Sequence, residues 1–443
     1  MRLRGGYFDH LLPKTQLAED DIPQDQPTDD RPFNPFRAPK TAKAHAVVAD
    51  VLGQLQSYER RKGLRQRQRK PTDQQTFEDT VAAVVCDLMH RFITKPSGWV
   101  SVSLSNQDLG RASRYRASAM NKTLPEILKR LAEPEMAFVE MEIGHLGFFG
   151  PARRTVMKAG SRLLTRLHEH GIGLDDLTQS TAKEVIILKQ AKGDYWDEGG
   201  LVEYDDTDQT RQYRDEVQTI NAWLAQADIQ FDPVDDLAVD NTDRLLRRYF
   251  SRGSFESGGR LFGGFWQPLS KWQRHKGLLI DGEEVTTLDY GQMAPRILYG
   301  MAGVPAPTTD AYLLPGLEAH RKGVKKVMNA LLFADKPLTR FPADTKTLFP
   351  PRISFPQVVE ALRQAHAPIS QLFGTGIGHQ VQFVESEILV DVLLALKAEG
   401  IIGLPVHDAV IVPTSSIPQV TRIMLEVFKA HTGVEGMVSE DGG

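Results

Sequence analysis

The chain has 443 residues, of which 41% are hydrophobic and 25% are charged, and its formal net charge is −4. This length predicts two or three globular domains. No apolar run approaches the roughly 20 residues that a membrane span needs, and the single cysteine, Cys86, excludes internal disulfides and cysteine-rich zinc sites. Because the N-terminus lacks the apolar core of a signal peptide, we expect a cytoplasmic protein without a membrane partner.

The N-terminal part divides into a polar arm and a helix that ends in a basic run. Residues 1–40 are polar and rich in proline, which predicts a disordered or loosely docked arm. Residues 41–74 have apolar residues at helical spacing and then become a basic linker. The Arg and Lys residues between Arg60 and Lys70 fit either a solvated helix face or a contact to the DNA backbone.

Residues 75–172 have the order of elements of a winged helix-turn-helix domain. A helix comes first, Ser103 or Ser105 can cap a second helix, residues 124–135 are amphipathic, and two strands joined by glycines follow between residues 136 and 159. Such domains place one helix in the major groove and a basic wing on the backbone. The alternative is a winged helix that binds only protein. The predicted DNA contacts are Arg111, Arg114, Arg116, Lys122, Arg153, Arg154 and Lys158.

Residues 173–250 are predicted to connect this domain to the C-terminal part. They contain the strand-like segment EVIILKQ, an acidic loop and a helix over residues 210–229. This helix is a candidate for a thumb.

Two aspartates in the C-terminal part each end an apolar strand. Asp289 ends TTLD, and Asp408 ends LPVHD in a segment that reads as strand, turn and strand. A lone aspartate at a turn is usually structural. If the two strands lie side by side in one sheet, the two carboxylates repel each other, and bound cations remove that cost. The pair therefore predicts a site for two Mg²⁺ ions, with Mn²⁺ as the alternative metal.

Two basic segments flank the first aspartate. In HRKGVKKVMNALLFADK, Arg321, Lys325 and Asn329 recur every four residues and share one helix face. A cationic row of this kind suits a triphosphate, and a solvated basic helix is the alternative. Upstream, Ser257–Trp272 has glycines around Arg260, which either permit close approach to a phosphate or base or form a turn between strands.

Four segments of the C-terminal part follow one another in the order GGR, LDYGQxxxR, RxxxK…F and VHD. This order resembles the motif set shared by family A DNA polymerases and single-subunit phage-type RNA polymerases. LDYGQMAPR resembles motif A, RKGVKKVMNALLFA motif B, LPVHDAVIV motif C, and GGRLFGGFWQ the arginine-bearing segment before motif A. The resemblance covers about residues 255–415, which is less than half of the chain. It implies an α+β fold in which residues 251–443 form a right-hand palm with an antiparallel sheet and helical fingers, beside the N-terminal winged helix.

The resemblance also implies roles for individual residues. Asp289 and Asp408 would be catalytic metal ligands, helped by the backbone carbonyl of Tyr290. The residues implied to bind the incoming nucleotide are Arg321, Lys325, Phe333, Ala294 and Tyr290. The residues implied to contact primer or template are Arg260, His407 and Gln382.

Three positions depart from the DNA polymerase pattern. Ala294 stands where a Glu usually helps to exclude the 2′-hydroxyl of a ribonucleotide. Phe333 lacks the hydroxyl of the Tyr with which the RNA polymerases help to select ribose, so we expect weak sugar discrimination. Ala409 replaces a third carboxylate directly after Asp408.

The sequence therefore predicts a template-directed nucleotidyltransferase. The favoured form is a DNA-dependent DNA polymerase that replicates phage or mobile-element DNA, with a primer-template, nucleoside triphosphates and replication accessory proteins as partners. An RNA polymerase or primase on the same fold is one alternative, which Ala294 favours. A non-catalytic DNA-binding regulator of replication or transcription is the other, and the intact pair Asp289 and Asp408 argues against it.

Overall fold

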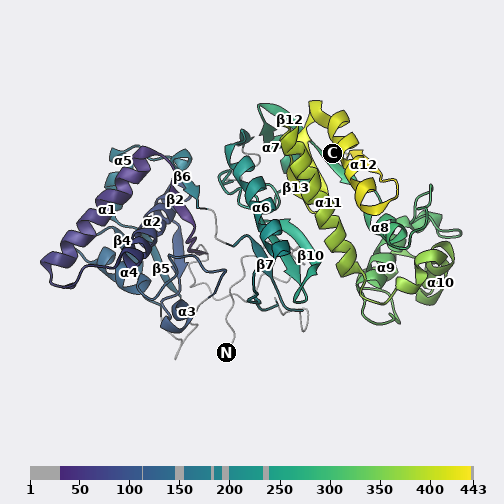
Figure 1. Ribbon diagram of the computed structural model, residues 1–443, viewed down its shortest axis with the longest axis horizontal. Helices are drawn as coiled ribbons and strands as arrows, with labels where there is room; N and C mark the ends of the chain where they lie inside the picture. The colour runs from purple at the N-terminus through teal and green to yellow at the C-terminus, as the bar shows by residue number, and fades with distance from the viewer. Residues whose placement is uncertain are drawn as a thin grey trace. The chain divides into compact units, whose positions relative to one another are not determined.

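The computed structural model of the protein describes residues 30–111, 113–144, 154–180, 184–191, 199–232 and 239–440. The chain divides into two compact units: residues 1–184 with 238–243, and residues 185–237 with 244–443. Both units mix helices with strands (Figure 1), so the predicted α+β class is confirmed for the described residues. The predicted connector over residues 173–250 is therefore divided between the two units.

The first unit packs helices on a four-stranded sheet. The sheet has the order β1 (Asp30–Pro32), β3 (Trp99–Val102), β5 (Thr155–Ala159) and β4 (Val139–Glu142). Only β1 and β3 run parallel among these pairs. A second pair joins β2 (Arg37–Pro39) to β6 (Leu177–Gln179). The helices are α1 (Ala42–Arg61), α2 (Pro71–Thr94), α3 (Asn106–Gly110), α4 (Leu124–Ala132) and α5 (Ser161–Glu169).

The order α2, β3, α3, α4, β4 and β5 agrees with the order of elements that led us to expect a winged helix. Ser105 rather than Ser103 caps α3, because its hydroxyl accepts a hydrogen bond from the backbone N–H of Asp108 at 3.3 Å. The apolar face of α4 is buried, as its amphipathic pattern predicts. The connection between β4 and β5 from residue 145 to 153, which includes Arg153, lies outside the described residues. Assignment of a winged helix stays a prediction.

Residues 30–40, the described end of the predicted arm, are docked in the first unit rather than disordered. They form β1 and β2, and Phe33 between them is buried. The backbone N–H of Asn34 donates to Asp87 Oδ2 at 3.1 Å, and Arg31 forms an ion pair with Asp87 at 2.6 Å. A proline-rich composition therefore does not prevent order where partners on α2 satisfy the polar groups. Residues 1–29 lie outside the described part of the chain.

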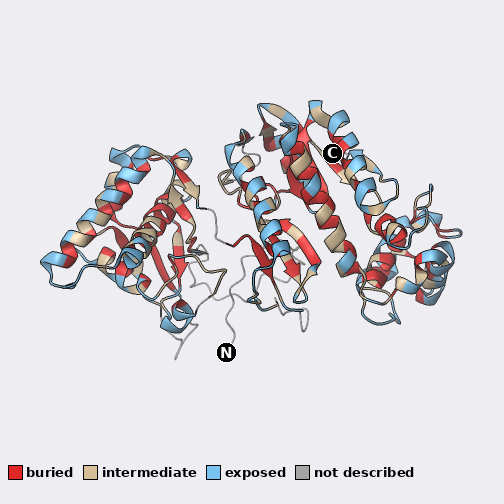
Figure 2. Ribbon diagram, in the orientation of Figure 1, coloured by how far each residue is buried: buried red, intermediate tan, exposed pale blue. Residues whose placement is uncertain are grey.

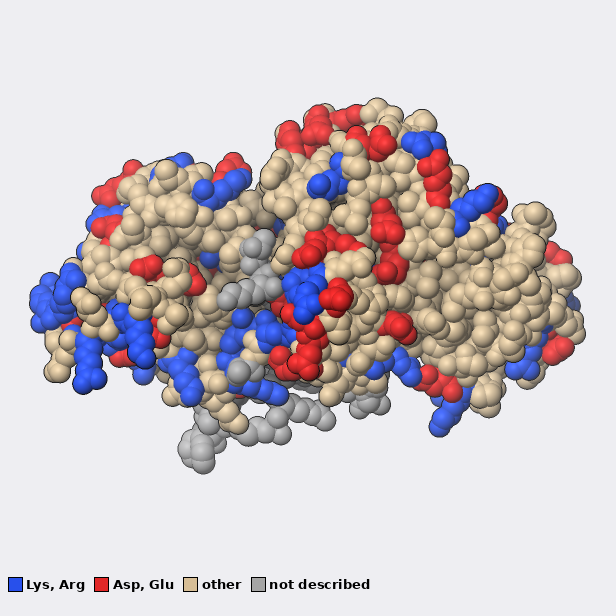
Figure 3. Space-filling view, viewed as in Figure 1, with Lys and Arg blue, Asp and Glu red and all other residues tan. Residues whose placement is uncertain are grey.

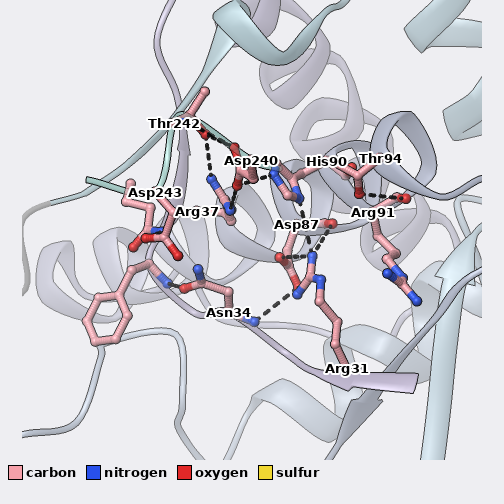
Figure 4. Close-up of polar contacts among 12 residues, drawn as sticks. Arg31, Asn34, Arg37, Asp87, His90, Arg91, Thr94, Asp240, Thr242 and Asp243 are labelled. Atoms are coloured by element: carbon pink, nitrogen blue, oxygen red, sulfur yellow. Dashed lines mark hydrogen bonds and ion pairs between the residues drawn. The ribbon is translucent and has the colours of Figure 1, made fainter. Parts of the chain in front are cut away.

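A buried polar network holds residues 239–243 in the first unit (Figure 4). Asp240 accepts hydrogen bonds from Arg37 Nη2 at 2.6 Å and from His90 Nε2 at 2.7 Å. Thr242 accepts a further hydrogen bond from Arg37 Nη1 at 3.2 Å. Burial alone would raise the pKa of Asp240, but the hydrogen bond with His90 and the charge of Arg37 outweigh burial and lower that pKa.

The second unit contains two sheets. The six-stranded sheet follows the order β13 (Leu404–Val406), β14 (Ala409–Pro413), β12 (Glu283–Tyr290), β11 (Leu278–Ile280) and β8 (Ile229–Phe231), and β15 (Val438–Glu440) also pairs with β12. All of its pairs are antiparallel. The three-stranded sheet has the order β10 (Ser254–Phe262), β9 (Arg247–Ser251) and β7 (Ile186–Leu188). The helices are α6 (Asp208–Gln226), α7 (Lys271–Gly277), α8 (Met293–Met301), α9 (Arg321–Phe333), α10 (Phe355–Ala365), α11 (Gly378–Ala398) and α12 (Ile417–Thr432).

Helix α11 is the central helix of the second unit (Figure 1). It packs against β10 and against α6, α8, α9 and α12, and much of its length is buried (Figure 2). The candidate thumb, α6, packs on α11 and β7 through buried residues such as Val217 and Ile220. Helix α6 is thus part of the body of this unit. In the described part of the chain, no helix combines the length and apolar character that crossing a membrane requires.

Candidate active site

Asp289 lies on β12, and Asp408 lies in the turn just before β14, the strand that neighbours β12. Strands β12 and β14 pair antiparallel, and Asp289 lies opposite Ala409. Asp408 immediately precedes Ala409 in a two-residue turn, because Val406 of β13 pairs with Ala409 of β14. The structure thus brings the two aspartates together at one end of the β12–β14 ladder. The strand that contacts β12 is the one that follows Asp408, not the one that precedes it.

The backbone of Asp289 is held from both sides. Asp289 lies opposite Ser439 of β15 as well as opposite Ala409 of β14. The next side chain, Tyr290, is buried, and its hydroxyl donates to the backbone carbonyl of Met424 on α12 at 2.7 Å. Successive side chains of a strand point to opposite faces of the sheet. Asp289 therefore points to the face away from α12.

The turn that carries Asp408 is fixed to the segment after β10. Trp266 Nε1 donates to the carbonyl of Pro405 at 2.9 Å, and Gln267 Nε2 donates to the same oxygen at 3.1 Å. His407 adopts a left-handed backbone conformation with φ of 57°, and its ring lies 5.9 Å from that of Phe262. Displacement of water by neighbouring groups, and then the charge of Arg260, lower the pKa of His407.

Arg260, the arginine of the glycine-rich segment, joins two residues of α11. Its Nη2 donates to Glu385 Oε2 at 2.8 Å. With the side-chain amide of Gln382 oriented so that its oxygen faces Arg260, this oxygen accepts from Nε at 3.1 Å and from Nη1 at 3.2 Å. Arg260 and Gln382, which the sequence placed separately near primer or template, are therefore direct neighbours.

Glu385 is a member of the cluster that our sequence reasoning missed. Its side chain is only 10% exposed. Burial, and then the charges of Asp408 and Asp289 against the opposing charge of Arg260, raise the pKa of Glu385 to about 7. The two aspartates and Glu385 therefore act on one another electrostatically. The spacing Gln382-x-x-Glu385, which places both residues on one helix face, is the signal that could have revealed it.

The cationic row of α9 lies beside a buried tyrosine. Arg321 and Lys325 are exposed, and their cationic groups lie 5.3 and 5.9 Å from the ring centre of Tyr312. Burial raises the pKa of Tyr312, and the charges of Arg321 and Asp408 also act on it. Tyr312 is thus within electrostatic reach of both the cationic row and the carboxylates. Sequence reasoning missed it because a lone tyrosine in a loop carries no pattern.

The remaining residues of the predicted nucleotide site lie on α8 and α9. Phe333 at the end of α9 is 41% exposed, and its ring meets His379 edge to face at 5.1 Å. Ala294 is half-buried in the first turn of α8. Arg296 on the same helix does not pair with Asp289. It is buried, and its Nη1 donates to the carbonyl of Glu435 at 2.8 Å.

The basic side chains of the first unit that we predict to contact DNA differ in exposure and in the partners that they bind. Arg111, Lys122 and Arg154 are exposed. Arg114 pairs with Glu184 at 2.9 Å. The others are also engaged: Arg116 donates to the carbonyl of Asp108, and Lys158 pairs with Glu140 at 3.0 Å above the ring of Trp99.

The donor set of the aspartate pair fits Mg²⁺. Among the described residues, no group of three or more His, Cys, Asp or Glu side chains could hold a metal ion. Mg²⁺, however, is commonly bound by one or two carboxylates together with substrate phosphates and waters. Asp289, Asp408 and the carbonyl of Tyr290 supply hard oxygen donors of that kind.

Comparison with known proteins gives only distant structural likeness. No family model matches the chain, and no curated protein matches it. Among solved structures, the chain is similar to the POL domain of Pol1 from M. smegmatis in complex with DNA primer-template and dNTP, with 11% sequence identity and a TM-score of 0.29. The match covers 53% of this chain and 51% of that chain. A likeness at this level carries no argument about function, which must come from the site itself.

Proposed function

We propose that the chain is a template-directed nucleotidyltransferase, and specifically a DNA-dependent DNA polymerase with a palm of the family A type. The observation that carries this proposal is the position of Asp289 and Asp408 at one end of the β12–β14 ladder. These are the aspartates of the segments that resemble motifs A and C. The arginine-bearing segment and the motif B segment contribute Arg260 and the α9 row to the same unit.

The proposed reaction joins the primer to the incoming nucleotide. The 3′-oxygen of the primer forms a bond to the α-phosphorus, the bond from that phosphorus to the bridging oxygen breaks, and pyrophosphate leaves. Asp289, Asp408 and the carbonyl of Tyr290 would hold Mg²⁺. When bound, Mg²⁺ lowers the pKa of the attacking hydroxyl and neutralises charge on the phosphate oxygens.

The basic residues of α9 would bind the triphosphate of the incoming nucleotide. Arg321 and Lys325 are exposed on one face of the helix, and Arg321 is held by Asp310 at 2.7 Å. A fixed cation binds phosphate with less loss of side-chain entropy than a mobile one. Phe333, exposed on the last turn of α9, offers an aromatic face to the new base pair.

Glu385 and Gln382 would position Arg260 toward the primer end. Both contact its guanidinium group, and together they restrict its rotation. His407, exposed on the turn before Asp408, would lie near the primer terminus. In this arrangement Glu385 of α11 also supplies a third carboxylate. The carboxylate that usually follows the motif C aspartate is replaced here by Ala409.

The first unit would bring the enzyme to DNA as a winged helix. Its α4 would enter the major groove, with the β4–β5 wing on the backbone. Replication of phage or mobile-element DNA, with accessory proteins, is the biological role that this combination of domains favours.

Extension of a labelled primer on a DNA template tests the proposal. With Mg²⁺ and dNTPs, the full chain should extend the primer, and Asp289→Asn should abolish extension. Glu284→Gln is the matched control, because Glu284 is exposed at the far end of the same strand and the substitution removes the same charge. No extension by the wild-type chain, or equal extension by Asp289→Asn, would refute the proposal.

RNA synthesis on the same site is the second candidate, and Ala294 favours it. A methyl group in the first turn of α8 offers little obstruction to a 2′-hydroxyl. We expect both dNTPs and rNTPs to be incorporated. Parallel extension assays with each nucleotide class measure the preference, and a dNTP preference above about a thousandfold, or about 4 kcal/mol, would contradict weak sugar discrimination.

A further inference from the structure

The end of α1 and its connection to α2 form an exposed basic segment, Arg60–Lys70, which we call the basic loop. Apart from Arg69, which is half-buried, every Arg and Lys of this loop is exposed. In Figure 3, Lys and Arg side chains gather at the left edge of the first unit, where α1 ends in Figure 1. None of these residues belongs to the site described above.

Some of the basic residues tie the loop to the rest of the first unit. Arg69 pairs with the buried carboxylate of Glu59 at 2.7 Å, and its guanidinium group lies 3.6 Å from the ring centre of Phe77. Glu59 also accepts a hydrogen bond from Arg130 of α4. The basic loop is therefore anchored at the end of α4, the helix that we expect to enter the major groove.

A second tether reaches the segment just after α4. Arg61 pairs with Glu135 at 3.0 Å, and Lys62 pairs with the same carboxylate at 2.5 Å. Surface ion pairs add little stability, but two cations on one carboxylate restrict the position of the loop. The tethers at Glu59 and Glu135 fix the loop beside α4 rather than leave it free to move.

The other cations of the loop form no ion pair with a carboxylate of the described residues. Arg60 donates to Ser57 Oγ at 3.1 Å, and Arg65 Nε donates to the carbonyl of Arg67 at 3.1 Å. No ion pair with a described acid occurs at Arg65, Arg67 or Lys70. Like charges so close together repel, and a polyanion relieves that repulsion.

We propose that the basic loop is a second contact to the phosphate backbone of double-stranded DNA, beside the contact made by α4. The proposal rests on the proposed DNA-binding role of the first unit. A loop that is held in register with a groove-binding helix suits the regular phosphates of a duplex better than a flexible single strand. The loop also offers a membrane only one large apolar side chain, Leu64, which is too little for stable insertion.

The test is the salt dependence of duplex binding by the full chain without nucleotide. A fluorescent DNA duplex is titrated at salt concentrations from about 50 to about 200 mM, and the anisotropy gives the affinity. The double variant Arg65→Ala/Arg67→Ala removes cations that hold no described acid. We expect the slope of log affinity against log salt to fall by about 2, and the affinity to fall roughly tenfold at the middle of this range.

The matched control is Lys40→Ala/Lys397→Ala, which removes the same charge from exposed positions away from the loop. Its slope should equal that of the wild type. An unchanged slope in the loop variant, or an equal change in both variants, would overturn the proposal. Loop-dependent binding to vesicles of phosphatidylserine and phosphatidylcholine, or to duplex RNA, together with loop-independent binding to DNA, would also overturn it and would identify the other polyanion.

Primer extension at saturating DNA separates this proposal from the proposed function. The loop variant should extend a primer at the wild-type rate per bound complex, since the loop lies outside the site. If the wild type does not extend a primer at all, the proposed function fails, while the binding slopes still decide the role of the loop.

Discussion

The two units place buried carboxylates in opposite electrostatic surroundings. In the first unit, Asp240 lies between Arg37 and His90, and its pKa is lowered despite burial. In the second unit, burial and the charges of Asp408 and Asp289 raise the pKa of Glu385 to about 7, although Arg260 is bound to it. An acid that meets cations is stabilised in its charged form, whereas acids that meet one another are not.

This difference separates a structural network from a functional one. Arg37 and His90, which bind Asp240, are supplied by the chain itself, so this network needs no external cation and holds residues 239–243 in place. The acids at the end of β12 and β14 carry an electrostatic cost that an external cation can relieve. Perturbed carboxylates of the second type gather at functional sites, and paired carboxylates of the first type usually contribute to the fold.

The largest expected effect comes from removing one of the two aspartates. Asp408→Asn should lower the rate of primer extension by at least about a thousandfold, because the Mg²⁺ site contributes about 4 kcal/mol or more to the barrier reduction. The midpoint of thermal unfolding should not fall, since the substitution removes a like charge. Steady-state extension assays and differential scanning calorimetry measure the two quantities.

A fall in thermal stability together with lost activity would show that Asp408 is part of the fold rather than of the chemistry. Asp408→Asn should also leave duplex binding nearly unchanged, because Asp408 is assigned to the metal site and not to a contact with the duplex. Glu284→Gln again serves as the control on the sheet, and it should change neither rate nor stability.

Substitution in the network around Asp240 should instead lower stability and leave activity unchanged. Asp240→Asn leaves Arg37 buried without its charge partner, which should lower the free energy of unfolding by about 3 kcal/mol. The rate of extension per folded molecule should stay at the wild-type value. Urea unfolding monitored by hydrogen exchange in α2 reports on the first unit, and Glu142→Gln at an exposed position of β4 is the control.

The pH dependence of this network has a definite sign. Because the folded-state pKa of Asp240 lies below its usual value of 3.8, its contribution to stability is complete above that pH and is lost as the pH falls toward the folded-state pKa. Asp240→Asn should therefore reduce the acid sensitivity of the first unit. Equal acid sensitivity in the variant and the wild type would contradict the role of Asp240.

Sequence patterns predicted the elements that depend on local signals. The strand that carries Asp289, the turn at His407 and Asp408, and the shared face of Arg321 and Lys325 follow from alternation, turn chemistry and helical spacing. Each of these depends on residues that are close in the chain. For this reason the local structure of the candidate site could be derived without knowledge of the fold.

The contacts that complete the site join distant segments, and the sequence did not reveal them. Glu385 lies on α11, which is buried on several sides, so the spacing of Gln382 and Glu385 marks one helix face but does not show what that face contacts. Its partner Arg260 is 125 residues away in the chain. Likewise, residues 30–40 looked disordered by composition because their partners on α2 and β3 cannot be inferred from their own sequence.

Glu385→Gln should have the smallest effect of these substitutions. It tests most directly whether Glu385 and Asp240 lie in opposite electrostatic surroundings. A carboxyl whose folded-state pKa is raised from 4.5 to about 7 binds protons more tightly in the folded state, so stability falls as the pH rises between these values. From pH 5 to pH 7 this fall should amount to about 2 kcal/mol in the wild type and should be absent in Glu385→Gln. Thermal unfolding across this pH range, without divalent metal, measures it.

Extension kinetics then show whether the same carboxyl positions Arg260. Glutamine retains an oxygen that accepts from Arg260, so Glu385→Gln should preserve the KM for the nucleotide and change kcat less than Glu385→Ala does. Glu385→Ala frees the guanidinium group and should raise the rate of extension from a mismatched primer end relative to a matched one. If both variants have the wild-type pH profile of stability, Glu385 does not share the electrostatic environment of Asp289 and Asp408, and the contrast between the two units would rest on the aspartates alone.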